Sequence, residues 1–339
     1  MADFLGYPFD PEIFDYNWQN EPDPTRTALL QSGAVVSDAD IARLISTGSD
    51  TYTIPFYKTI SGDPDNYDGQ TNIQSTEATG DSQSGIVFGR AKGFTARDFI
   101  KDFNSGADPM RQITSQIAQY WNKRRQSMLI GILNAIFGIT DTSFANHTLN
   151  LATKAATVTD DNRIGEATIA DSTVQAVGDN SGIFTLAVMH SNVAARLAKL
   201  DLLEYRKYTD LQGIQRTLRI ADINGMLALI DDGVPVTDSA TATGSKEYTT
   251  YVLGNGVIRT AAAPVEHPSE VERAASINGG QDTLYTRIRE TIHPNGFTYT
   301  KPTSGYTSSP TDAQLNASAR WSRKMDAKSI AIARVITNG

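Results

Sequence analysis

Hydrophobic and polar residues alternate along several segments of this chain, which predicts extended β-strands. Residues 51–60 alternate in this way, and residues 282–293 do so over a greater length. In the longer segment Ile288, Glu290 and Ile292 share one face because successive strand residues point to opposite sides. Glu290 therefore lies on an apolar face, where we expect it to meet an arginine. The pattern is typical of a structural sheet rather than an active site.

A different period predicts one long helix. Asp108 followed by Pro109 is a strong helix start, and the helical pattern can continue to Gly138, a length of about 45 Å. The first half carries an apolar stripe that ends at Trp121. Residues 128–137 are apolar on nearly every side. We therefore expect the second half of this helix to be buried.

Three basic residues, 123–125, interrupt the apolar pattern of the long helix. The simplest interpretation is a solvated basic turn. The alternative is that Arg124 and Arg125 contact an acidic surface of a neighbouring subunit. A nucleic-acid patch is less favoured, because three charges give little affinity at physiological salt.

Residues 61–85 are acidic and contain no lysine or arginine. With residues 51–60 before them and residues 86–88 and 93–97 as a returning strand, they predict a long two-stranded arm with an acidic tip. A lone two-stranded ribbon is only marginally stable in water, so this arm needs a partner surface. A calcium loop is the alternative, but the segment lacks EF-hand spacing. The acidic residues are Asp63, Asp65, Asp68, Glu77 and Asp81.

The N-terminal residues 1–27 combine several prolines with several aromatic residues. Proline disfavours helix and sheet, whereas disordered segments are usually poor in aromatic residues. We therefore favour an extended arm that packs on the fold or on a neighbour over a disordered leader. Residues 37–47 predict a short helix with Ser37 as its N-cap.

From residue 165 the pattern becomes mixed α/β. Residues 167–177 predict a helix, residues 184–189 a buried strand, and Ser191 the cap of a helix that ends near Leu200. Asn-Gly pairs supply the positive φ angles of two-residue hairpin turns. Hairpins are therefore predicted at 224–225, 255–256 and 295–296.

Composition narrows the functional classes. The chain has 339 residues, a net charge of −8 and no cysteine. The charge does not favour general binding to nucleic acid or anionic membranes, and the lack of cysteine excludes disulfides and thiol chemistry. No secretion signal begins the sequence, and no run reaches the ~18 apolar residues of a membrane span. We expect no contact with a membrane.

The sequence contains no pattern that we recognise as a catalytic, cofactor or metal site. The four histidines are scattered, and Glu290 and His293 fall on opposite faces of their predicted strand. Asp231 and Asp232 form the best carboxylate pair, but Gly233 follows directly and favours a simple turn. The chain is therefore expected not to be an enzyme and to need no cofactor.

The order of these parts resembles the major capsid proteins of tailed bacteriophages, which have the HK97-type fold. Short blocks in the second half of the chain carry the resemblance together with that order. They are residues 188–192, 202–205, 230–236, 248–251 with Gly254, and 289–297.

The resemblance implies an α+β HK97-like fold. Residues 1–50 would form the N-arm and residues 51–95 the extended E-loop, lying across a neighbouring subunit. Residues 96–160 and 265–339 would form the P domain with the long spine helix. Residues 161–264 would form the mixed α/β A domain. The last strand, 328–336, is assigned to the P domain, with the A domain as the alternative.

The resemblance also implies a function: self-assembly as hexamers and pentamers into an icosahedral head that encloses phage double-stranded DNA. Expected partners are scaffolding and portal proteins, with a decoration protein as a further candidate, and expected assembly takes place in the host cytoplasm. The alternatives are an encapsulin-like nanocompartment shell and, more distantly, a hydrolase that uses Asp231, Asp232 or Glu290. The candidate subunit contacts are Asp63, Asp65, Asp68, Glu77, Asp81, Arg124, Arg125, Arg287, Arg289 and Glu290.

Overall fold

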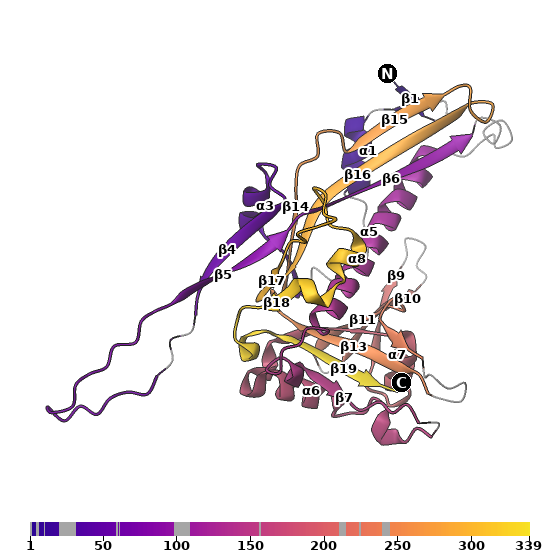
Figure 1. Cartoon of the computed structure of the whole chain (residues 1–339). Helices are drawn as coiled ribbons and strands as arrows, with labels where there is room; N and C mark the ends of the chain where they lie inside the picture. The colour runs from indigo at the N-terminus through magenta and orange to yellow at the C-terminus, as the bar shows by residue number, and fades with distance from the viewer. Residues whose placement is uncertain are drawn as a thin grey trace.

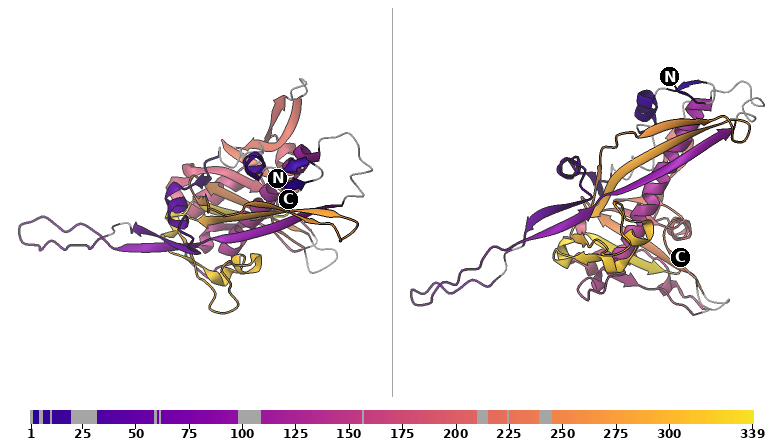
Figure 2. Two further views of the ribbon diagram at one scale, coloured as in Figure 1. Left: turned by 90° about the horizontal axis from the view of Figure 1, so that it is seen from above. Right: turned by 45° about the horizontal axis from the view of Figure 1, so that its top comes forward.

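A computed structural model describes residues 2–4, 7–9, 11–19, 32–58, 60, 62–97, 109–155, 157–209, 215–223, 225–238 and 245–339. It shows an elongated body from which one long arm projects (Figures 1 and 2). None of the helices in this described part has the length and apolar content that crossing a bilayer requires.

The strands and helices are numbered along the chain. The strands are β1 (Ala2–Phe4), β2 (Tyr7–Phe9), β3 (Val35–Ser37), β4 (Thr51–Tyr57), β5 (Gly80–Ile86), β6 (Phe88–Arg97), β7 (Thr148–Asn150), β8 (Phe184–Met189), β9 (Glu204–Thr209), β10 (Gln215–Ile223), β11 (Met226–Ile230), β12 (Val236–Thr237), β13 (Glu247–Gly254), β14 (Ile258–Ala262), β15 (Ser269–Ala274), β16 (Gln281–Pro294), β17 (Phe297–Tyr299), β18 (Trp321–Arg323) and β19 (Ile332–Thr337). The helices are α1 (Pro11–Gln19), α3 (Ala39–Ile45), α5 (Pro109–Ile136), α6 (Thr168–Val177), α7 (Ser191–Lys199) and α8 (Asp312–Leu315).

Two larger sheets organise the body. The large sheet has the strand order β7-β19-β13-β8-β11-β10-β9, with β12 paired to β13. The spine sheet is built on the 14-residue strand β16. Strand β6 pairs along one edge of β16, and β15 and then β14 pair along the other, with β3 beside β14. The predicted long strand and the predicted α+β class are both confirmed.

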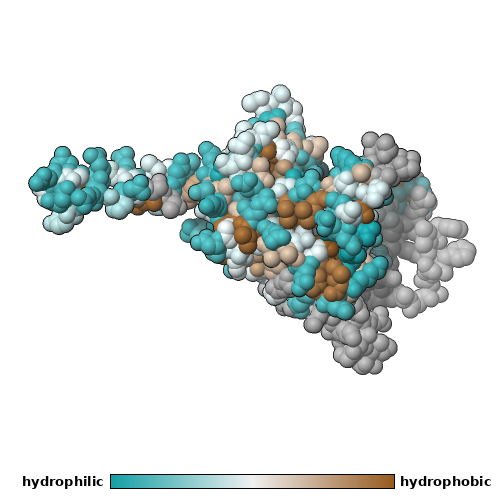
Figure 3. Space-filling view, turned by 90° about the horizontal axis from the view of Figure 1, so that it is seen from below, coloured by the Kyte–Doolittle hydropathy of each residue, from teal (hydrophilic) through white to brown (hydrophobic). Residues whose placement is uncertain are grey.

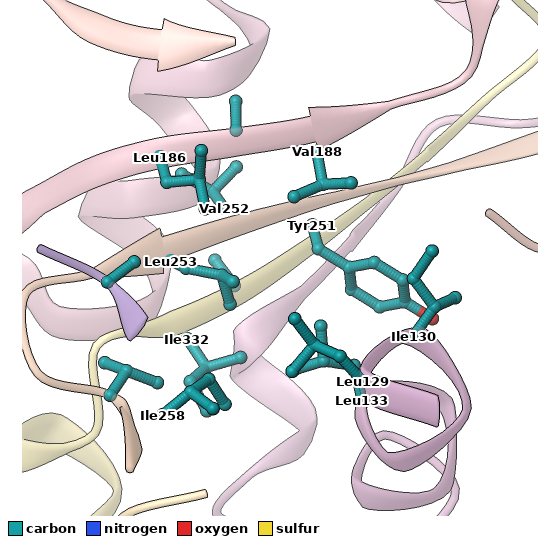
Figure 4. Packing of buried hydrophobic residues seen from close by; sticks show 14 of the residues in the cluster. Leu129, Ile130, Leu133, Leu186, Val188, Tyr251, Val252, Leu253, Ile258 and Ile332 are labelled. Carbon is teal, nitrogen blue, oxygen red and sulfur yellow. The ribbon is translucent and has the colours of Figure 1, made fainter. Parts of the chain in front are cut away.

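The 28-residue helix α5 connects the cores of the two sheets. In its first half Ile117 and Trp121 are buried with Leu284 and Ile288 of the spine sheet. The Trp121 indole N–H donates to the Thr286 hydroxyl across 3.1 Å. Its second half is buried in the main core against the large sheet (Figure 4). Each large side chain buried in this way stabilises the fold by about 1.5–3 kcal/mol, so the helix holds both layers together.

The prediction of an extended N-terminal arm is wrong for residues 11–19, which form α1. Pro11 occupies the first helical position, where the missing N–H costs nothing because that group has no helical acceptor. Phe14 packs into the cluster of Ile117 and Trp121. This contact agrees with the prediction that the aromatic segment packs on the fold or on a neighbour. Residues 20–27 and the predicted cap Asp108 lie outside the described residues.

Two predicted helix caps are displaced by one residue. The cap of α3 is Asp38 rather than Ser37, since the Asp38 carboxylate accepts from the backbone N–H of Asp40 and Ile41. The cap of α7 is His190 rather than Ser191, because its ring nitrogen Nδ1 accepts from the Asn192 N–H across 3.1 Å. In both cases the residue next to the predicted cap also carries a hydrogen-bond acceptor, and it occupies the N-cap position instead.

Of the three predicted Asn-Gly hairpins, only the first is confirmed. Strands β10 and β11 pair directly across residues 224–225, although Asn224 itself lies outside the described residues. The turns at 255–256 and 295–296 instead carry the chain out of one sheet into another. Gly256 and Gly296 have φ of 67° and 90°, so the tight turns exist, but β14 pairs with β16 and β17 pairs with β18.

The C-terminal strand belongs to the large sheet. Strand β19 lies between β7 and β13 in the large sheet, parallel to β7 and antiparallel to β13. It begins at Ile332, later than expected, because residues 327–329 form a short 3₁₀ helix.

Candidate assembly surfaces

The arm is a two-stranded ribbon in which β4 pairs with β5, from Thr51 opposite Ile86 to Tyr57 opposite Gly80. The predicted return strand is therefore wrong in position: β5 returns, and the β6 segment pairs with β16 instead. Beyond the paired strands the chain continues outward as a long loop, which is described without a gap over residues 62–79 (Figure 1). Strand β5 escaped prediction because its sequence, GDSQSGI, is mostly polar.

Large apolar side chains lie exposed on the outer part of the arm. Tyr57, Tyr67 and Ile73 are 86%, 93% and 77% exposed, and Ile60 is also exposed. The remaining surface of the arm is predominantly hydrophilic (Figure 3). Exposed apolar side chains on a projecting ribbon form a surface that is available to a partner.

The tip of the arm carries exposed acidic residues. Asp68 accepts hydrogen bonds from the backbone N–H of Thr71 (2.7 Å) and Gln70 (2.9 Å). These bonds, that of Thr71 first, lower the pKa of Asp68 to about 2. Asp63, Asp65 and Glu77 are likewise exposed. Within the described residues no three His, Cys, Asp or Glu side chains form a group that could hold a metal ion.

The base of the arm is fixed to the spine sheet by buried polar contacts. The Gln83 side chain is 1% exposed. It donates to Asn295 Oδ1 across 2.9 Å and accepts from the Gly296 N–H across 2.7 Å. The Tyr52 hydroxyl lies 2.9 Å from that of Thr291, and the Tyr52 ring meets His293 edge-on. Sequence reasoning missed these residues, because their partners are more than 200 positions away.

Asp81 lies at the same base between two lysines. Its carboxylate is 3.4 Å from Lys58 Nζ and 3.8 Å from Lys324 Nζ. Hydrogen bonding, chiefly from the Ser82 N–H, lowers the pKa of Asp81. Of the five acidic residues, Asp81 is therefore the one that is engaged with the body of its own subunit.

Two arginines of α5, Arg124 and Arg125, have partners within the chain. Arg124 and Arg90 both pair with Asp312 of α8. Arg125 Nε lies 2.6 Å from Glu290 Oε2, and Glu290 is only 8% exposed. The prediction that Glu290 meets an arginine is confirmed. These pairs fasten α5 to α8 and β16.

Arg287 and Arg289 lie on the opposite face of β16 and are partly exposed. Arg287 pairs with Glu270 across 2.9 Å. Arg289 donates to the carbonyl oxygens of Gly48 (2.8 Å) and Ser49 (2.7 Å), next to the start of the arm. The sequence thus placed these two arginines on a surface, and the structure adds that Arg289 holds the segment that leads into the arm.

The carboxylate pair Asp231 and Asp232 occupies a turn after β11, as expected. Asp231 accepts from the Gly233 N–H (2.8 Å) and from the Gln126 side chain (2.6 Å). Asp232 accepts from the Ser191 N–H at the start of α7 (3.1 Å). These contacts give both residues a structural role in the turn.

A long helix that joins a spine sheet to a mixed large sheet, with a projecting two-stranded arm, is the architecture of an HK97-type phage capsid protein. Solved structures agree on this fold. The capsid of Ralstonia phage GP4 aligns with a TM-score of 0.59 and 11% identity, covering 91% of this chain and 90% of that one. The capsid of cyanophage Pam1 aligns with a TM-score of 0.54 and 10% identity, covering 100% and 99%.

Sequence comparison identifies the family. The family model for Gp13-like proteins, described as "Major capsid protein 13-like", matches residues 111–331, more than half of the chain. The chain belongs to this family of major capsid proteins. The major capsid protein of Bacillus phage SPP1 is 27% identical over 308 residues, covering 90% of this chain and 89% of that relative.

Proposed function

We propose that this major capsid protein builds the icosahedral head of a tailed phage by laying its arm across a neighbouring subunit. The observation that carries the proposal is the exposure of Tyr57, Tyr67 and Ile73 on an arm that projects from the body. Burying a large apolar side chain stabilises an assembly by roughly 1.5–3 kcal/mol each. A neighbour that covers the arm therefore gains stability that an isolated subunit lacks.

The domain assignment follows the two sheets. Residues 1–50 act as the N-arm and 51–95 as the E-loop. The P domain comprises 96–160 and 265–339, and the A domain 161–264. Sheet membership supports two adjustments: β14 and β3 go with the P domain because they extend the spine sheet, and β7 and β19 go with the A domain.

The charged candidates divide into two groups. Asp63, Asp65, Asp68 and Glu77 of the tip, together with Arg287 and Arg289 of the spine sheet, are accessible to a neighbour. Arg287 and Arg289 also have partners within the subunit. The remaining candidates are likewise paired within the subunit, and we assign them the role of fixing its shape. They are Asp81, Arg124, Arg125 and Glu290.

The remaining partners follow from the same role. Subunits assemble in the host cytoplasm as hexamers and pentamers, with scaffolding and portal proteins and with a decoration protein as a further candidate. The shell encloses double-stranded DNA, and the net charge of −8 leaves the packaged DNA free to move. The protein performs this role without catalysis. Membership in the capsid family favours a phage head over the encapsulin-like and hydrolase alternatives.

Replacing residues 60–77 with a short Gly-Ser turn tests the proposal. The change keeps β4, β5 and the 3.0 Å hydrogen bond from the Lys58 N–H to the Thr79 carbonyl. We expect a folded subunit with a nearly unchanged unfolding midpoint but no closed particles by negative-stain electron microscopy.

The matched control replaces polar side chains of the same loop, Gln70→Ala with Asn72→Ala, and should form normal particles. A second variant, Tyr67→Ala with Ile73→Ala, isolates the apolar contribution and should lower the particle yield. Normal particles from the chain with the shortened arm would overturn the proposal.

A further inference from the structure

A pocket of about 190 Å³ lies between the C-terminal end of α5, the short helix at 145–147 and the edge of the large sheet. Phe137 and Phe144 form aromatic walls, and Arg334 and Thr148 contribute polar groups. A volume of this size holds several water molecules or the end of a side chain.

Arg334 is the unusual residue of this pocket. It lies on β19, directly opposite Tyr251 of β13 and Thr148 of β7, so its side chain shares their face of the sheet. The guanidinium lies over the Phe137 ring, 4.7 Å from the centroid. Its Nε is buried and has no hydrogen-bond partner. The side chain of Arg334 thus contacts an aromatic ring of the pocket.

The carboxylate in the pocket wall is already engaged elsewhere. Asp141 accepts from Arg323 Nε (2.8 Å) and from the Ser143 N–H (2.9 Å). The bond from Arg323 is the main cause that lowers the pKa of Asp141. The charge of Asp141 is thus balanced by that of Arg323, and the positive charge of Arg334 has no such counterpart in the pocket wall.

Arg334 is partly exposed, but its buried Nε–H lacks a hydrogen-bond acceptor, and contact with an aromatic face compensates only part of the hydration lost there. Arginine remains charged in proteins and presents a planar fork that fits a carboxylate. We propose that this pocket binds a carboxylate, with the Arg334 guanidinium as its anchor and the two phenylalanine rings as its walls.

Two sources can supply that carboxylate: a free small carboxylate, or an aspartate or glutamate of another copy in the shell. The second source rests on the proposed function. The chain carries 38 acidic against 30 basic side chains, so neighbouring copies offer carboxylates in excess.

The first experiment titrates the unassembled subunit with sodium acetate against sodium chloride at constant pH and ionic strength. We expect a saturable rise of the thermal unfolding midpoint and a saturable shift of the Arg334 Nε–H signal in ¹⁵N-arginine-labelled protein. Arg334→Met should abolish the thermal response. Arg43→Met, a change of an exposed arginine on α3, should leave it intact.

Arg334→Lys keeps the positive charge but not the planar fork, so its acetate response should be weaker than that of the wild type. The labelled wild-type protein provides a measurement that remains valid if Arg334→Met fails to fold.

The second experiment is a cryo-electron-microscopy map of assembled shells. An acidic side chain of a neighbouring copy within hydrogen-bonding distance of Arg334 identifies the shell as the source, even without an acetate response. A response in the free subunit, together with a shell in which no acidic side chain reaches Arg334, identifies the free carboxylate. No acetate response together with a pocket that holds only water in the shell would overturn the proposal. Failure to form particles would count against the proposed function but would leave the acetate titration interpretable.

Discussion

The bridge that Gln83 makes at the base of the arm leads to a quantitative prediction. Gln83→Met keeps the volume of the side chain but removes both of its hydrogen bonds, so the contribution from a new cavity is small. The Gly296 N–H is buried and loses its acceptor, at a cost of about 1–3 kcal/mol, whereas half-buried Asn295 can turn toward water. With about 1 kcal/mol for the second bond, the expected loss of unfolding free energy is roughly 2–4 kcal/mol.

Urea denaturation measures this loss directly, and hydrogen exchange at the Gly296 amide tests its location. Typical domains are stable by about 5–15 kcal/mol, so the variant should still fold. Because the bridge fixes the arm to the spine sheet, we also expect fewer closed particles than from the wild type.

Gln70→Met is the matched control, since Gln70 is exposed on the same arm. It should change the unfolding free energy by less than about 0.5 kcal/mol. If Gln83→Met changes stability as little as this control does, or if exchange at Gly296 stays slow, the buried amide does not hold the arm.

Three further changes test other parts of the subunit. Glu290→Met and Arg125→Met should each destabilise by about 3–5 kcal/mol and their combination by less than the sum, as measured in a urea double-mutant cycle; additive losses would contradict a coupled pair. Gly254→Ala places a Cβ 2.4 Å from that of Ala331 and should lower the unfolding free energy by about 1–3 kcal/mol, as measured by thermal unfolding. An unchanged unfolding midpoint would show that the backbone at Gly254 can move away from Ala331 without loss of stability. Burial lowers the pKa of His293 to about 3, so the unfolded chain takes up its proton first. Stability should therefore fall from about pH 6.5 toward pH 3 by up to ~1.4 kcal/mol per unit, and His293→Phe should flatten this slope in acid denaturation.

The parts of the fold that the sequence predicted well are those with a long, strong period. Helix α5 and strand β16 have many apolar positions in register, and the strand face alone predicted that Glu290 meets an arginine. The structure identifies that arginine as Arg125. The Asn-Gly turns at 255–256 and 295–296 were misassigned for a physical reason. The pair specifies a local turn but not which strand the chain meets afterwards, and here tertiary contacts select another sheet.

The same distinction applies to the assembly surfaces. An acidic segment without lysine or arginine is visible in the sequence and predicted the tip of the arm. Gln83 and Tyr52 carry no local signal, because their hydrogen-bond partners lie 212 and 239 residues away in sequence. The ion pair of Arg124 could not be predicted from the sequence either, because its partner Asp312 belongs to a distant short helix.

The position of β19 has a consequence for how the protein is made. This strand separates β7 from β13 in the large sheet, yet it is the last of these strands to leave the ribosome. At roughly 5–20 residues per second, the 182 positions from the end of β7 to the start of β19 take about 9–36 s to translate. During that time the sheet is split and β7 lacks a partner strand. A nascent chain therefore cannot complete the large sheet before β19 itself has been translated.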